Sequence, residues 1–126
     1  MSAAPQLDQV TLTFPEVLNL ANTRHAHYMV QHKAVSAWKR RASIMEPKLR
    51  GGRPMVPWTR VRCRPVLYTF NRFDADNAAA ALKLAIDLLK GTWIIDDRAP
   101  YFELLLPVTQ VIDRHTPRLE LHLEKV

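Results

Sequence analysis

The sequence predicts one α/β (α+β) domain over residues 1–126, a small mixed four-stranded sheet with two helices packed on it in the order β-α-β-α-β-β. A chain of 126 residues holds enough material for one hydrophobic core. Its 48% hydrophobic and 24% charged residues are ordinary for a globular protein. Segments with the two-residue period of strands alternate with segments of helical period, and this alternation predicts a sheet covered by helices.

A strand and then a helix are predicted in the first third of the chain. Val10, Leu12 and Phe14 alternate with threonines, which predicts a strand with one buried face that ends at Pro15. Within Tyr28–Met45 apolar side chains recur at helical spacing, and basic side chains occupy much of the remaining surface. The apolar positions are Val30, Ala34, Trp38, Ala42 and Met45.

The next predicted strand carries arginines on one face. In residues 59–64 three arginines alternate with less polar residues, so we expect the three guanidinium groups to point to the same side. Pro65 has no backbone N–H to donate to a neighbouring strand. It therefore predicts an edge position or a bulge before residues 66–70.

A helix and two strands complete the predicted fold. Residues 77–90 are rich in Ala and Leu and are followed by Gly91, the usual residue just past a helix end. The apolar run 102–108, with Pro107 near its end, predicts a strand. In residues 119–124 leucines alternate with polar residues, which predicts the final strand.

The positive charge of the chain is concentrated in its middle. The formal charge is +6, but residues 24–72 hold twelve Lys and Arg residues against the single acid Glu46, a formal charge of +11. The segments on either side are acidic. A basic segment of this kind predicts a polyanion as partner, with nucleic acid as the first candidate.

Cysteine content and hydropathy predict an intracellular location with no membrane role. The single Cys63 excludes an intramolecular disulfide and a cysteine-rich zinc site. Residues 1–9 lack the basic start and apolar run of a secretion signal, and no apolar stretch approaches the roughly 20 residues of a membrane helix. We therefore expect a cytoplasmic protein that works on DNA.

Two pairs of aspartates flank the predicted second helix. Asp74 and Asp76 lie at its start, where Asp76 would cap the helix and Asp74 would interact with the helix dipole. Asp96 and Asp97 follow it, where the simplest role is a solvated turn. Alternatively these carboxylates converge on a hard divalent cation such as Mg²⁺, which prefers carboxylate oxygens.

The residues around this helix resemble the RusA family of Holliday-junction resolvases. The matching runs are 71–77 (Asn-Arg-Phe-Asp-Ala-Asp-Asn), 82–88 (Leu-Lys-Leu-Ala-Ile-Asp-Leu) and 93–97 (Trp-Ile-Ile-Asp-Asp). In that family a D-x-D-N motif leads into a helix with a lysine and an aspartate, followed by Asp-Asp. The N-terminal half is similar as well, in Asn22, Arg24, His27 and the run Trp38-Lys39-Arg40.

The resemblance implies a homodimeric, Mg²⁺-dependent endodeoxyribonuclease that resolves four-way DNA junctions by paired symmetrical hydrolysis in recombination and repair. Asp74, Asp76 and Asp97 match the family's metal-binding acids, and Lys83 matches its essential lysine. Lys83 lies about one helical turn further from the second acid than in the family. The alternative for Lys83 is an ordinary i,i+4 ion pair with Asp87.

In this hypothesis basic residues hold the DNA backbone while the acids and Mg²⁺ support in-line hydrolysis. The expected DNA-contacting residues are Arg60, Arg62, Arg64, Arg72, Lys39 and Arg40, with Arg41 extending the surface. The same charge distribution also fits a non-catalytic basic nucleic-acid-binding module whose acids only cap a helix. A third, weaker hypothesis is a subunit whose basic face docks on an acidic protein.

Overall fold

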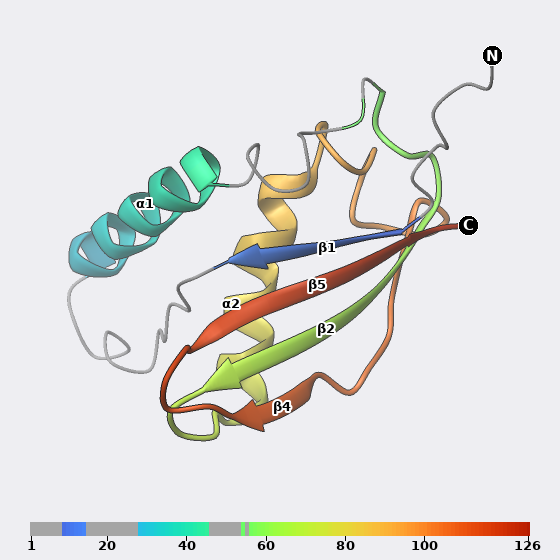
Figure 1. Ribbon diagram of the computed structural model, residues 1–126. Coiled ribbons are helices and arrows are strands. Elements are labelled where there is room, and N and C mark those ends of the chain that lie inside the picture. Colours follow the sequence, from blue (N-terminus) through green and yellow to red (C-terminus); the bar gives the residue numbers. More distant parts are fainter. Residues whose placement is uncertain (1–8, 15–27, 46–53, 55) are drawn as a thin grey trace, which may run out of the picture.

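A computed structural model describes residues 9–14, 28–45, 54 and 56–126 (Figure 1). The elements follow the order β-α-β-α-β-β-β, which confirms the predicted mixed α+β class and adds one strand to the expected four. They are β1 (Gln9–Phe14), α1 (Tyr28–Met45), β2 (Val61–Thr69), α2 (Ala75–Leu89), β3 (Phe102–Leu104), β4 (Thr109–Ile112) and β5 (Arg118–Lys125).

The sheet is mixed, and β2 lies inside it. The strand order is β1-β5-β2-β3, and β4 pairs with β2 further along the same side as β3. β5 runs antiparallel to both of its neighbours, whereas β3 and β4 run parallel to β2. The parallel pairing follows from the chain's return through α2, a helical crossover of the kind that parallel strands require.

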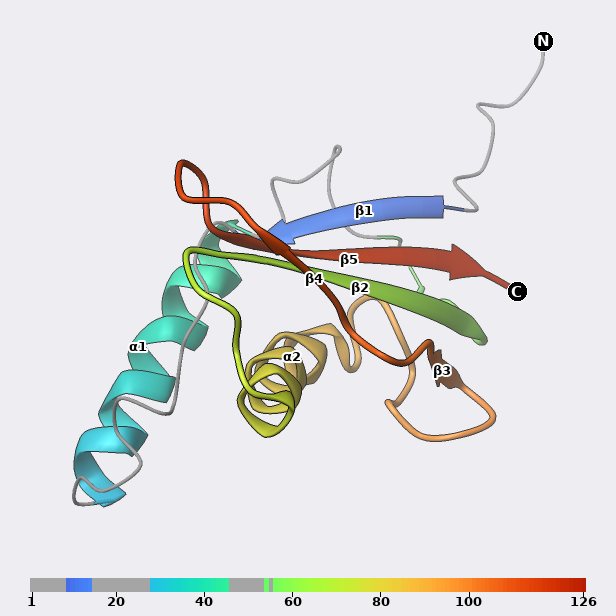
Figure 2. The ribbon, with the colours of Figure 1, turned by 90° about the horizontal axis from the view of Figure 1, so that it is seen from below.

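Both helices lie on the same side of the sheet. Figure 2 shows α1 and α2 below the strands, while no described helix covers the opposite side, here called the open face. The alternation in β5 explains this asymmetry, because Leu119, Leu121 and Leu123 are buried whereas Glu120 and His122 remain partly exposed. No helix in the described part of the chain combines the length and apolar character needed to cross a membrane.

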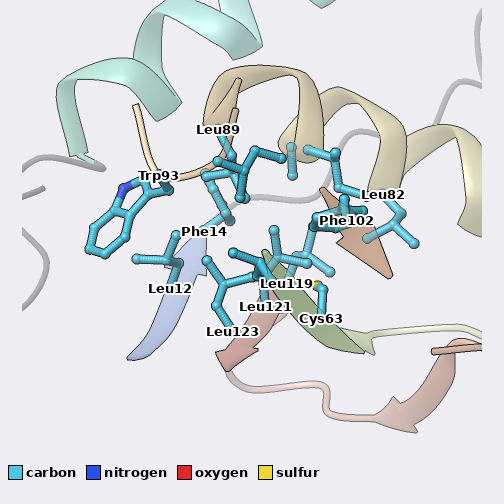
Figure 3. Packing of buried hydrophobic residues seen from close by; sticks show 14 of the residues in the cluster. Leu12, Phe14, Cys63, Leu82, Leu89, Trp93, Phe102, Leu119, Leu121 and Leu123 are labelled. Atoms are coloured by element: carbon cyan, nitrogen blue, oxygen red, sulfur yellow. The ribbon is translucent and has the colours of Figure 1, made fainter. Parts of the chain in front are cut away.

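The core forms between α2 and the helix-facing side of the sheet (Figure 3). Leu12 and Phe14 of β1 meet the three β5 leucines there, and the ring of Trp38 lies 6.1 Å from that of Phe14 between centroids. Trp38 is thus a core residue, as its place in the apolar seam predicts. Cys63 is also enclosed, and loss of hydration raises the pKa of its thiol to about 12, so the thiol stays protonated.

The edge or bulge prediction for Pro65 is wrong. β2 is continuous from Val61 to Thr69, and Pro65 is buried inside it opposite Leu121. On the other side of β2, pairing with β3 ends at Cys63 and pairing with β4 begins at Val66. Pro65 therefore lies where the parallel ladder is interrupted, so its missing N–H costs little in this interior strand.

The single strand expected at residues 102–108 is also wrong. β3 ends at Leu104, Pro107 lies in the connection, and β4 begins at Thr109. Proline lacks the donor that a ladder needs, which divides the apolar run into two short strands. The sequence reading missed β4 because its residues, Thr109–Ile112, carry no regular alternation of buried and exposed positions.

Truncation of the core should destabilise the fold strongly. Leu121 is fully buried in β5, so Leu121→Ala should lower the free energy of unfolding by about 2–5 kcal/mol, because it removes buried methyl groups and leaves a cavity. Chemical denaturation followed by circular dichroism measures this change. Glu124→Ala, at an exposed position of the same strand, should change stability by less than about 0.5 kcal/mol. Equal effects of the two variants would contradict the core described here.

Candidate functional site

The start of α2 presents two aspartates. Asp74 is the N-cap residue in extended conformation, and its carbonyl accepts a hydrogen bond from the Ala78 N–H at 2.9 Å. This corrects the expected N-cap, which was Asp76; Asp76 lies inside the first helical turn. The carboxylate of Asp74 makes no side-chain capping hydrogen bond, so capping does not account for this side chain.

The Asp74 side chain borders a pocket of about 780 Å³. Arg72 and Phe73 line it on the approach to α2, and Ala78 and Ala79 line it along the helix. The opposite wall comes from the β3–β4 connection and β4, through Leu106, Pro107, Val108 and Gln110. An arginine and a carboxylate thus share one largely apolar depression.

A second pocket, of about 330 Å³, lies further along α2. It is lined by Lys83 and Asp97 together with Leu82, Ile86, Phe102 and Leu104. Ala79, Leu106 and Val108 line both pockets, so the two adjoin. We call the two pockets together the α2 groove, with Asp74 at one end and the pair Lys83–Asp97 at the other.

Asp97 is held by two lysines, Lys83 of α2 and Lys90, the residue that caps the C-terminal end of this helix. Its Oδ2 lies 3.4 Å from Nζ of Lys90 and 3.8 Å from Nζ of Lys83. The alternative ion pair of Lys83 with Asp87 at i,i+4 does not form. Lys83 contacts Asp97, and Asp87 pairs with Lys90 at 3.5 Å. Loss of hydration raises the pKa of Asp97, but a hydrogen bond within the Asp96–Asp97 turn and the charges of both lysines outweigh it, and the net pKa is lowered.

The side chain of Asp96 contacts residues of its own loop and does not line the α2 groove. Its Oδ1 accepts a hydrogen bond from the Asp97 N–H at 2.7 Å, and its Oδ2 pairs with Nε of Arg98 at 3.0 Å. These contacts fix the turn that carries Asp97. Of the two neighbours, Asp97 is therefore the one that faces α2 and the pocket.

Sequence reasoning missed the residue that fixes the turn before α2. The Gln110 side chain of β4 accepts a hydrogen bond from the Phe73 N–H at 2.9 Å and donates one to the Phe73 carbonyl at 3.1 Å. The residue next to Asp74 is thereby tied to the sheet. A lone glutamine in an irregular strand carries no local signal of this role.

The candidate metal ligands do not form one cluster in this conformation. Within the described ranges, no group of three or more His, Cys, Asp or Glu side chains is placed to hold a metal ion. Asp97 stands with the lysines, apart from Asp74 and Asp76. A pair of carboxylates nevertheless fits Mg²⁺, which commonly takes one or two carboxylates and completes its shell with water and substrate phosphate.

Most charges on the open face are paired with one another. Glu120 contacts Nε of Arg118 at 3.0 Å and Nε2 of His122 at 3.1 Å, and Arg118 also reaches Asp113 at 2.9 Å. The Arg118 guanidinium stacks 3.7 Å from the ring centroid of Tyr68. This face therefore balances its own charge and is not a simple cationic surface.

The basic residues predicted to contact DNA fall in four places. Arg62 and Arg64 line a polar pocket of about 300 Å³ on the open face, where Nε of Arg62 pairs with Glu103 at 3.2 Å. Arg72 lies in the α2 groove. The others are Arg60, exposed just before β2, and Lys39 and Arg40 on α1.

Three residues of the resemblance noted in the sequence, Asn22, Arg24 and His27, lie outside the described residues.

Comparison of the chain with protein-family models, with curated proteins and with solved structures gives no match.

Removal of the Gln110 side-chain amide should loosen the turn that carries Asp74. Gln110→Leu should lower the free energy of unfolding by about 1–2 kcal/mol and speed amide hydrogen exchange at residues 73–75, because two hydrogen bonds to Phe73 are lost. Hydrogen exchange read by mass spectrometry measures the local effect. Thr109→Val, on the same strand, should leave that exchange unchanged, and faster exchange in both variants would contradict a specific role for Gln110.

Proposed function

We propose that this chain is a Mg²⁺-dependent endodeoxyribonuclease that nicks four-way DNA junctions, with its active site in the α2 groove. One observation carries the proposal: the groove joins a carboxylate that serves no capping role, Asp74, to an arginine at one end and a lysine–aspartate pair at the other. Contacts within the turn account for Asp96, whereas the structural role of the Asp74 carboxylate is limited to a favourable charge at the positive end of the α2 dipole. The sequence resemblance at residues 71–97 points to the same residues.

The charges of the groove suit a phosphodiester only when a cation is present. Asp74 and Asp76 alone would repel a phosphate, because two carboxylates stand at the helix start. Bound Mg²⁺ would offset the charge on the phosphoryl oxygens and activate water for hydrolysis. Asp74, Asp76 and Asp97 are the residues that would hold one or two such ions. Asp74 and Asp76 share the helix start, whereas Asp97 would have to exchange its lysine partners for the ion.

The chain's own cations have separate tasks in this proposal. Arg72, at the mouth of the groove, binds and orients the DNA backbone through its guanidinium. Lys83, 69% exposed, offers an ammonium group to a phosphoryl oxygen in the second pocket. Arg60, Arg64, Lys39 and Arg40 extend the sequence-independent attraction for the backbone.

Paired nicking requires two active sites. A four-way junction has near two-fold symmetry, so a symmetric homodimer is the simplest assembly that cuts two strands at equivalent positions. The proposal therefore includes a C2 dimer, which sedimentation of the protein at assay concentrations examines directly.

A second candidate function is a non-catalytic module that binds branched or other nucleic acid. The ion pairs of Asp97 with Lys83 and Lys90 favour it, because they give that carboxylate a structural use without any metal. Both candidates predict DNA binding. Only a divalent-cation requirement for strand cleavage separates them.

Neutralising Asp74 should abolish cleavage and spare binding. In a nicking assay on a synthetic four-way junction with Mg²⁺, Asp74→Asn should lower the rate by about 100-fold or more, because one charged ligand is replaced by an amide of the same shape. Junction affinity in EDTA should be equal or tighter, since a repulsive charge is gone.

The matched control is Glu124→Gln, which removes an exposed carboxylate on the open face. This control should cut at the wild-type rate. Undiminished cutting by Asp74→Asn would exclude the α2 groove as the active site. Junction binding without any Mg²⁺-dependent nicking in the wild type would instead establish the binding module.

A further inference from the structure

We propose that the open face of the sheet binds an unpaired DNA strand, whose bases stack on Tyr68 and Phe70. This surface lies on the side of the sheet opposite the helices (Figure 2), away from the α2 groove. The inference therefore goes beyond the proposed nuclease site and does not depend on cleavage. Only the choice of DNA over RNA rests on the proposed function.

Strand β2 arranges flat side chains in one line on the open face. Every second residue of β2 points toward the helices, and the residues between them point to the open face. These are Arg62, Arg64, Val66 and Tyr68, and Phe70 follows in the same two-residue period just past the strand. The line thus begins with two guanidinium groups and ends with two aromatic rings. Both groups are planar, and proteins use both to stack on unpaired bases.

The aromatic end of this line is exposed apolar surface. Phe70 is 54% exposed, although it is a large aromatic residue. Val111 of β4, 39% exposed, pairs with Tyr68 and therefore lies beside it on the open face. Contiguous apolar side chains on an otherwise polar face are typical of a binding surface, whereas single ones are not.

Two arginines already stack on the rings. The guanidinium carbon of Arg118 lies 3.7 Å from the ring centroid of Tyr68, and that of Arg114 lies 5.1 Å from the ring centroid of Phe70. Two acids hold Arg118 in place, so it forms a fixed flat pair with Tyr68. Arg114 has no ion pair with any acid in the described part of the chain, so its guanidinium can turn from the ring to a phosphate.

The spacing along β2 suits one base for each pair of flat groups. Side chains two residues apart on a strand are separated by about 6.6 Å. Stacked bases lie about 3.4 Å apart in nucleic acid, so one base fits between two flat groups at this separation. Tyr68 and Phe70 are two residues apart at the end of β2, and Arg62 and Arg64 have the same interval nearer its start. A DNA strand lying along β2 therefore contacts the rings at one end and the guanidinium groups at the other.

Stacking supplies more of the affinity than charge does. Arg64 pairs with none of the described acids, but Arg62 pairs with Glu103, and Glu124 lines the same pocket. We therefore expect one or two phosphate contacts. On a single strand each contact contributes about −0.7 to the slope of log association constant against log salt concentration, so the slope should be about −0.7 to −1.4. A duplex keeps its bases stacked inside and should bind this face more weakly.

The test measures binding of a fluorescent oligothymidine to the whole chain in EDTA by fluorescence anisotropy. Phe70→Ala should weaken binding about tenfold, a loss typical of one stacked base, whereas Phe70→Trp should bind at least as tightly as the wild type. The matched control is Ile112→Ala. Ile112 is 51% exposed, but it pairs with the buried Thr69 and so lies on the helix-facing side, where its removal should leave the affinity unchanged.

Further arms of the same assay separate the possible outcomes. Arg64→Gln should make the salt slope shallower by about 0.7, because one phosphate contact is lost. Absence of binding by the wild type, equal affinities of wild type and Phe70→Ala, or equal affinities for oligothymidine and its duplex with oligoadenosine would overturn the inference. Tighter binding of oligouridine would overturn the choice of DNA. None of these results concerns cleavage, so each leaves the proposed nuclease function standing.

Discussion

The packing of α2 on the sheet determines where the α2 groove and the side chains along it lie. Ala78, Leu82, Ala85 and Leu89 bury one stripe of the helix against the strands, and this fixes the rotation of the helix about its axis. Lys83 lies between those positions and must then face outward, toward the loop that carries Asp97. Lys90 follows the last buried residue, Leu89, as the C-cap of the helix, and it meets Asp97 from there. A different rotation of α2 would remove the lysine–aspartate contacts and the pocket that they border.

Charged side chains are arranged differently on the open face of the sheet and in the α2 groove. On the open face, Arg118, Glu120 and His122 satisfy one another, so this surface offers little net charge to a partner. In the α2 groove, the carboxylate of Asp74 makes no capping hydrogen bond, and Arg72 lines the same pocket. Among the described basic residues of the segment 24–72, Arg62 pairs with Glu103 while Arg72 lines the α2 groove, so their charges do not form one uniform cationic surface.

Regular periodicity explains which parts of the fold the sequence predicts. α2 and β5 follow their expected positions because each buries a face with a clear repeat, and α1 spans the residues that its helical spacing predicts. Pro65 predicts an edge or a bulge, but it lies in an interior strand where the pairing of β2 with β3 and β4 is interrupted. Pro107 is expected near the end of one strand, but it lies in the connection between two short strands, β3 and β4. The pairing of Asp97 with Lys90 depends on the turn after Gly91, and the hydrogen bonds between Gln110 and Phe73 join residues that are far apart in the sequence. Local sequence patterns predict neither contact.

Strand-by-strand mapping of nicks on a synthetic four-way junction distinguishes a Mg²⁺-dependent nuclease from a module that only binds DNA. Each of the four strands is labelled in turn and incubated with the wild-type protein in Mg²⁺ or in EDTA. We expect Mg²⁺-dependent nicks at equivalent positions in two opposing strands, and none in EDTA. Intact strands under conditions in which the junction is fully bound, or equal nicking with and without the metal ion, would contradict this expectation.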